Sequence, residues 1–118
     1  MAQQAGFDAA VLDSPCENVD NAARKVIEDA GFSPDYGTPG LPHRTGHGIG
    51  LEVHEATYMV RGNMTPMQPG LCFSVEPTIC IYDEFGIRLE DCAYMTADGP
   101  RWLTPPALNV DDPFGYEG

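Results

Sequence analysis

Residues 42–55 read Pro-His-Arg-Thr-Gly-His-Gly-Ile-Gly-Leu-Glu-Val-His-Glu and include all three histidines of the chain, His43, His47 and His54. Three glycines separate these histidines. Neutral imidazole is a common metal ligand and proton carrier near neutral pH, and glycine lets a backbone approach a metal or a substrate closely. Tyr58 stands where a His-Glu-x-x-His zinc helix would need its second histidine, which excludes that motif. Pro42 and the glycines disfavour a helix, so an extended segment that forms a functional site is predicted.

The segments on either side of this stretch change from a helical to a strand-like pattern. Apolar spacing predicts a helix over residues 2–12 and a second over residues 19–30, capped by Asn18 or Asp20 and ended by Gly31. The later segments predict strands over 71–81, 87–96 and 101–104, turns over 83–86 and 98–99, and irregular chain over 33–42 and 58–70. Helices followed by an antiparallel sheet predict the α+β class.

Composition limits the partners and the compartment. The 118 residues carry 18 acidic and 6 basic side chains, a net charge of −12, so nucleic acid and anionic membranes are poor partners because both bind cationic surfaces. No segment has the pattern of a membrane span or of a signal peptide. The four cysteines show no Cys-x-x-Cys spacing, which predicts reduced, buried thiols in a cytoplasmic protein.

Glu76 is a carboxylate that needs a partner. It lies in the apolar run of residues 72–80, and burial of an unpaired charge is costly, so either a metal ion or Arg88 is expected beside it. Side chains two apart share a face of a strand, which puts Arg88 and Glu90 together, although Glu90 taken alone is typical of a solvated strand end. Pro77 argues for a sheet edge or a bulge at this point. An imidazole with two carboxylates suits Mn²⁺, Fe²⁺, Co²⁺ or Zn²⁺.

Three motifs in this order resemble those of the pita-bread metallopeptidases. They are residues 42–55, the run Met-Gln-Pro-Gly-Leu-Cys-Phe-Ser-Val-Glu-Pro at 67–77 and the run Gly-Ile-Arg-Leu-Glu-Asp at 86–91. The resemblance covers about residues 2–104 and is closest for Xaa-Pro dipeptidases and Xaa-Pro aminopeptidases. It implies a partial pita-bread fold over residues 1–104, with N-terminal helices packed on a curved antiparallel sheet, followed by an acidic, proline-rich tail over residues 105–118.

The same resemblance implies a role for each candidate residue. His47, Glu76 and Glu90 correspond to metal ligands of the family. Glu76 would also serve as the catalytic general acid and base, and Glu90 would bridge two metal ions. His43 and His54 correspond to histidines on the substrate side of the site, which act near the scissile carbonyl and the prolyl residue.

Arg88 corresponds to a substrate-binding arginine that the proline-specific branch carries two positions before its bridging glutamate. The implied activity is metal-dependent hydrolysis of Xaa-Pro bonds in short peptides. The implied cofactor is a pair of divalent ions, with Mn²⁺ preferred and Co²⁺, Zn²⁺ or Fe²⁺ as alternatives. A non-catalytic pita-bread binding module and a creatinase-type amidohydrolase are the alternative functions.

Two further metal ligands of the family have no counterpart in this chain. They are aspartates on strands that precede the helix resembling residues 2–12. Glu76 and Glu90 supply two negative charges, too few to compensate two adjacent divalent ions, so this chain alone is expected to bind at most one ion weakly and to be inactive. A homodimer, or association with the preceding part of the protein, is expected because a truncated sheet exposes an unpaired edge.

Overall fold

The computed structural model describes residues 1–107 and 109–113 and contains two helices and seven strands in that part of the chain. In chain order the elements are α1 (Ala2–Asp8), α2 (Glu17–Asp29), β1 (Gly46–Gly48), β2 (Glu55–Met59), β3 (Cys72–Val75), β4 (Thr78–Ile81), β5 (Phe85–Arg88), β6 (Asp91–Thr96) and β7 (Gly99–Trp102). Helices come first and the strands that follow pair antiparallel, which confirms the predicted α+β class.

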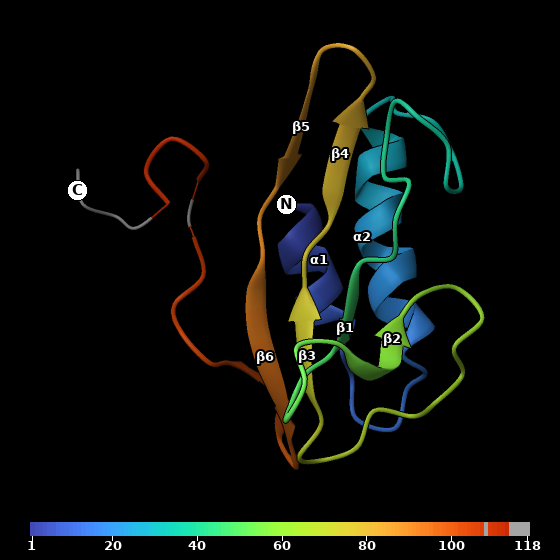
Figure 1. Ribbon diagram of the computed structural model, residues 1–118. Helices are drawn as coiled ribbons and strands as arrows, with labels where there is room; N and C mark the ends of the chain where they lie inside the picture. Colours follow the sequence, from blue (N-terminus) through green and yellow to red (C-terminus); the bar gives the residue numbers. More distant parts are fainter. Residues whose placement is uncertain (108, 114–118) are drawn as a thin grey trace.

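The strands form two sheets, and the chain runs directly from one into the other. Five of them form one sheet in the order β2-β1-β3-β6-β7, and β4 and β5 form a separate hairpin. Figure 1 shows this hairpin extending from β3 and β6, with α1 behind the strands and α2 alongside them. The hairpin therefore continues two neighbouring strands of the larger sheet beyond the point where that sheet stops.

One face of the larger sheet forms the core against the helices. The buried core cluster consists of Ala10, Cys16, Val19, Met59, Met67, Phe73, Val75, Ala93 and Met95. Because side chains alternate across a strand, Phe73 and Val75 of β3 point to the helices and Ser74 between them points to the opposite face. On that opposite face the Ser74 hydroxyl accepts from the backbone N–H of His47 on the neighbouring strand β1.

Both helices are present, with ends that differ from the prediction. Helix α1 stops at Asp8, before the predicted end at residue 12, and Asp13 has a positive φ of 67°. Helix α2 begins at Glu17, so the prediction that Asn18 or Asp20 caps it is wrong. Gly31 follows the helix with a φ of 100°, which confirms its role as a terminating glycine.

The strand predicted over residues 71–81 divides into β3 and β4. Pro77, where a sheet edge or a bulge was expected, lies in neither strand and marks the point where the chain leaves one sheet for the other. The strand predicted over residues 87–96 divides in the same way at Leu89 and Glu90. Proline lacks the N–H that a central ladder needs, which explains why the pairing stops here.

Two strands differ from the prediction elsewhere. Strand β2 was not predicted, and part of it lies in the segment expected to be irregular. It pairs with β1 through Gly46 opposite Met59, with a register shift, and Thr57 has a φ of 71°. Such a strand has no clean alternation of apolar and polar residues to reveal it. Strand β7 begins at Gly99, two residues before its predicted start.

The segment after β7 is irregular as far as it is described. The backbone N–H of Ala107 donates to the Asp91 carboxylate at 3.4 Å, while residues 108 and 114–118 lie outside the described residues. The boundary between a domain over 1–104 and a tail over 105–118 remains a prediction. All four cysteines are free thiols; Cys16 is buried as predicted, whereas Cys72, Cys80 and Cys92 are partly exposed. Within the described chain, no helix combines the length and apolar character that crossing a membrane requires.

Candidate metal site

His47 lies on β1 between two glycines where a side chain would force the neighbouring backbone to move. A Cβ on Gly46 would collide with the carbonyl oxygen of Ser74 on β3, and a Cβ on Gly48 would collide with the carbonyl oxygen of Ala56 on β2. Strand β1 is therefore enclosed on both sides by neighbouring backbone. The glycines of the histidine segment serve this close packing, which fixes where the histidine backbone lies.

The His47 ring is buried and held in one orientation. Its Nδ1 lies 2.9 Å from the carbonyl oxygen of Gly48, and the histidine is 2% exposed. A carbonyl oxygen only accepts, so Nδ1 carries the proton and Nε2 has its lone pair free for a metal. The backbone N–H of His47 donates to the Ser74 hydroxyl at 3.0 Å, and that hydroxyl donates to Glu76 Oε1 at 3.3 Å.

The two glutamates lie where the sheet divides. Glu76 follows the last residue of β3, and Glu90 precedes the first residue of β6. The larger sheet ends with the pair Val75 and Asp91, so the glutamates extend from adjacent strands just past the last pair. The backbone N–H of Glu76 donates to the Thr45 carbonyl oxygen at 2.7 Å, which ties this break to the histidine segment.

The donor atoms of His47, Glu76 and Glu90 converge. His47 Nε2 lies 3.0 Å from Glu76 Oε1 and 4.0 Å from Glu90 Oε1, and one donor atom of each residue lies within 4.8 Å of the others. Two donors on one ion can stand at most about 4.2 Å apart, twice a bond of about 2.1 Å. Both measured histidine distances meet that limit, so a small movement of the exposed Glu90 side chain would complete a divalent cation site.

The charges at this point favour a cation. Partial burial, followed by the hydrogen bond and the negative charge of Glu76, raises the pKa of the Glu90 carboxyl above its ordinary value of 4.5. Arg88 compensates only weakly, because its Nη1 lies 3.9 Å from Glu76 Oε2 and its Nε donates to the Thr78 hydroxyl at 2.6 Å. Both partners expected for Glu76, a metal ion and Arg88, therefore have geometric support. The His47 imidazole lies nearer to Glu76 than Arg88 does.

A cavity of about 430 Å³ surrounds these donors and contains every site residue that the sequence predicted. It is lined by His43, Arg44, His47, Val53, His54, Glu76, Arg88 and Glu90. The His54 ring lies 4.4 Å from the His47 ring, between ring centroids, at an angle of 59°. His43, His54 and Arg88 are exposed side chains that line the cavity, so a bound molecule can reach them.

A buried ion pair on α2 holds the histidine segment, and the sequence analysis missed it. Asp20 Oδ1 accepts from the Thr45 backbone N–H at 3.0 Å and from the Thr45 hydroxyl at 2.8 Å. Arg24, paired with Asp20 at 3.0 Å, donates to the His43 carbonyl oxygen at 2.9 Å. The signal in the sequence was a charged pair four residues apart among apolar helix positions, but a helix cap explained Asp20 equally well.

Arg44 is a second cavity residue that sequence reasoning passed over. Its guanidinium lies 4.4 Å from the centroid of the Tyr58 ring on β2, which supports the side chain at the cavity wall. Position 44 lies inside the histidine segment, so its place in the sequence was the available signal. The cavity therefore combines an acidic, metal-binding corner with two guanidinium groups, those of Arg44 and Arg88.

Comparisons with known proteins identify the family and the fold. The model of metallopeptidase family M24 matches residues 1–97. The Xaa-Pro dipeptidase of Lactobacillus delbrueckii subsp. lactis is 45% identical over 103 residues, which are 87% of this chain and 27% of that protein. The structure of dipeptidase PepE from Mycobacterium ulcerans is 42% identical with a TM-score of 0.80, and the prolidase from Pyrococcus furiosus is 33% identical with a TM-score of 0.79.

Those two structures are each matched over 88% of this chain, which corresponds to 27% of the dipeptidase and 29% of the prolidase. The chain thus spans about a quarter of the length of the curated relatives and solved structures it matches.

Proposed function

Because the chain belongs to metallopeptidase family M24 and has a partial pita-bread fold, we propose that it is the metal-binding segment of a peptidase that hydrolyses Xaa-Pro bonds. The observation that carries the proposal is the convergence of His47 Nε2 with carboxylate oxygens of Glu76 and Glu90 in one cavity. The substrate class is supported by the relative named Xaa-Pro dipeptidase, which is 45% identical over most of this chain.

The proposed metal ligands are His47, Glu76 and Glu90. Divalent ions held there would supply an activated water and polarise the scissile carbonyl. Glu76 takes the proton of the attacking water on its carboxylate and passes it to the leaving prolyl nitrogen. The Ser74 hydroxyl, which donates to Glu76 Oε1, keeps this carboxylate aimed at the cavity.

The substrate-side residues are His43, His54 and Arg88. The two exposed histidines reach the cavity from the same segment, and either can donate to the oxyanion that forms from the scissile carbonyl. The Arg88 guanidinium can hold a carboxylate through two parallel hydrogen bonds. The proposed substrate is therefore a short, proline-containing peptide.

The proposed cofactor is a pair of divalent ions in the whole protein, with Mn²⁺ preferred and Co²⁺, Zn²⁺ or Fe²⁺ as alternatives. This chain alone binds at most one of them weakly, because Glu76 and Glu90 supply two negative charges. We propose that the remaining ligands come from a segment outside this chain, that the whole protein is a homodimer, and that it acts in the cytoplasm. Titration calorimetry with Mn²⁺ should show no more than one weak site, and two tight sites would contradict this count.

The activity is tested in the full-length enzyme with Glu76→Gln. Loss of the general base should lower turnover of an Xaa-Pro dipeptide by at least about 100-fold. Glu84→Gln, on the exposed turn between β4 and β5, is the matched control and should keep turnover unchanged. Wild-type turnover in the Glu76 variant would remove that residue from its role. A metal-loaded wild type that leaves Xaa-Pro peptides intact would favour the binding module, or, if it hydrolyses creatine, the amidohydrolase.

A further inference from the structure

Gln3 on α1 contacts both points at which the sheet divides, although it lies more than 70 residues away in sequence. Its side-chain Nε2 lies 3.2 Å from the Val75 carbonyl oxygen, 3.4 Å from the Leu89 carbonyl oxygen and 3.0 Å from Asp91 Oδ2. Val75 precedes Glu76, while Leu89 and Asp91 flank Glu90. One amide group therefore bonds to the immediate neighbours of both carboxylates of the candidate metal site.

The position of this amide matters because sheet pairing is interrupted there. The larger sheet ends at the pair of Val75 with Asp91, and the hairpin begins at the pair of Thr78 with Arg88. The two residues between these pairs on each strand have no ladder partner in the named strands. The separation of the strands at this point, and so of the Glu76 and Glu90 side chains, depends on other contacts.

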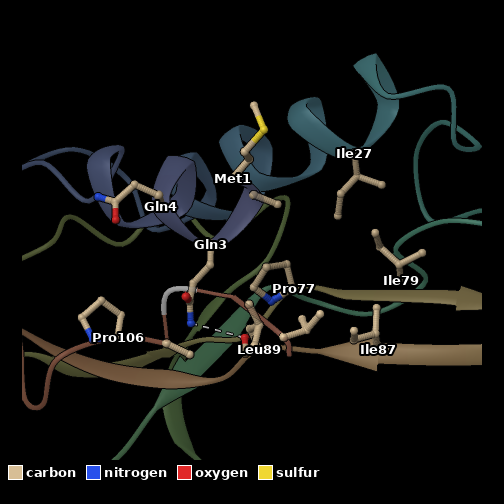
Figure 2. Close-up of a pocket in the computed structure, with 12 residues that line it drawn as sticks. Met1, Gln3, Gln4, Ile27, Pro77, Ile79, Ile87, Leu89 and Pro106 are labelled. Carbon is tan, nitrogen blue, oxygen red and sulfur yellow. Dashed lines mark hydrogen bonds between the residues drawn. The ribbon is translucent and has the colours of Figure 1, made fainter. Parts of the chain in front are cut away.

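The surroundings of the Gln3 amide strengthen its hydrogen bonds to the two strands. Gln3 is 8% exposed, and Figure 2 shows its side chain reaching down from α1 to Leu89 in a pocket of about 360 Å³. That pocket is mostly apolar, with Pro77, Leu89 and Ile87 among its lining residues. Hydrogen bonds in apolar surroundings are stronger than those in water, and an acceptor that loses its donor there is left unsatisfied.

We propose that Gln3 is a positioning residue that sets the separation of the Glu76 and Glu90 carboxylates. The amide bonds both to the end of β3 and to the start of β6, which fixes the distance between these two ends. Glu76 and Glu90, the residues adjacent to these two ends, are therefore held at a fixed separation. The proposal relies on the proposed function only in taking these carboxylates as metal ligands. It predicts that an α1 side chain that never touches the ion controls how well the ion is held.

The test compares Gln3→Met with Gln4→Met in the 118-residue chain, using Co²⁺ alone as the probe. Gln3→Met keeps the shape of the side chain and removes its donors, and should weaken Co²⁺ binding about tenfold, as loss of a supporting contact around a metal ligand does. Gln4 is exposed on the same helix, and within the described residues its side chain bonds to Asp8 alone, so Gln4→Met should bind Co²⁺ as the wild type does. Gln3→Asn retains the amide on a shorter side chain and should bind with intermediate affinity.

A stability control separates positioning from general loosening of the fold. Met67→Val trims a buried core residue in the segment that bonds to Asp13 and Ser14, and should lower Tm without weakening Co²⁺ binding. Crystal structures of the metal-free wild type and of Gln3→Met, or of Gln3→Asn if the first variant does not fold, should show wider separation of the glutamate Cα atoms in the variant.

Unchanged separation of Glu76 and Glu90 in the Gln3 variants would overturn the proposal, as would an equal loss of Co²⁺ affinity in Met67→Val. A wild type that binds no Co²⁺ would contradict the proposed function instead. The carboxylate separation in the metal-free crystals would still decide the role of Gln3.

Discussion

Helix α2 carries two ion pairs with the same four-residue spacing and opposite exposure, which allows a sharp prediction. Arg24 lies 3.0 Å from Asp20, with side chains that are 2% and 0% exposed. Lys25 lies 2.9 Å from Asp29, with side chains that are 73% and 63% exposed. The change to be compared is Arg24→Met against Lys25→Met, since each removes a cation and keeps an unbranched side chain on the same helix.

The magnitude follows from what each change leaves behind. Arg24→Met leaves the Asp20 carboxylate buried without its counter-ion, and breaking a buried pair in this way costs about 3–5 kcal/mol. It also removes the donors to the carbonyl oxygens of Asp35, Leu41 and His43. The exposed Lys25 pair contributes little to stability, because water already solvates both charges. The expected difference is therefore several kcal/mol between adjacent positions.

Thermal and urea unfolding followed by circular dichroism measure this difference. For a domain of this size, 1 kcal/mol corresponds to about 4 °C in Tm, so Arg24→Met should unfold about 12–20 °C lower and Lys25→Met within about 2 °C of the wild type. A stability loss of less than about 1 kcal/mol for Arg24→Met would refute the reasoning that this pair is buried and holds the histidine segment to α2. So would equal losses in the two variants.

Three further predictions concern the site. Gly46→Ala should prevent correct pairing of β1, because its Cβ would meet the Ser74 carbonyl, whereas Gly86→Ala, whose Cβ would lie 3.5 Å from its nearest neighbour, should fold normally by circular dichroism. Ser74→Ala should weaken Mn²⁺ binding about tenfold in a calorimetric titration, because it removes the hydroxyl that bonds to both His47 and Glu76. Unchanged affinity would contradict this. The raised pKa of Glu90 means that the metal-free fold binds its proton more tightly than the unfolded chain does, so stability falls as pH rises from 4.5 through the folded value. Glu90→Gln should therefore raise Tm at about pH 7.5 and leave it unchanged at about pH 3. A lower Tm of the variant at neutral pH would contradict the conclusion that the Glu90 charge destabilises the metal-free fold.

The candidate site was largely accessible from the sequence because its residues lie in three short segments of strong local character. His47 lies among glycines that only a close backbone approach explains, and Glu76 lies in an apolar run where an unpaired charge is costly. Even spacing on a strand also placed Arg88 and Glu90 on one side, and both line the cavity. The roles of these residues in catalysis remain proposals.

The rest could not be predicted because it depends on contacts between distant segments. Pro77 indicated an interruption, but only the pairing of β3 with β6 shows that the sheet divides there. Asp20 has the residue type and position of a helix cap, and its burial becomes visible only once the segment around Thr45 covers it. Gln3 lies in an alanine-rich helix, and its bonding partners are more than 70 residues away.

Helix α2 shows what a local sequence pattern can predict. The helix was predicted from its apolar spacing and its end from the residue type of Gly31, and both are observed. Strand β2 shows the opposite case, because a positive φ at Thr57 and a register shift against β1 leave no alternating pattern in its sequence. Regular elements were predictable, and the irregular ones that shape the site needed the tertiary structure.

The most direct test of the central claim is an anomalous difference map at the manganese edge from a crystal of this chain soaked in Mn²⁺. We predict one peak within bonding distance of His47 Nε2 and of carboxylate oxygens of Glu76 and Glu90, and its loss in Glu90→Gln crystals. A map with no peak at these three residues, or with manganese bound only elsewhere on the acidic surface, would contradict the account.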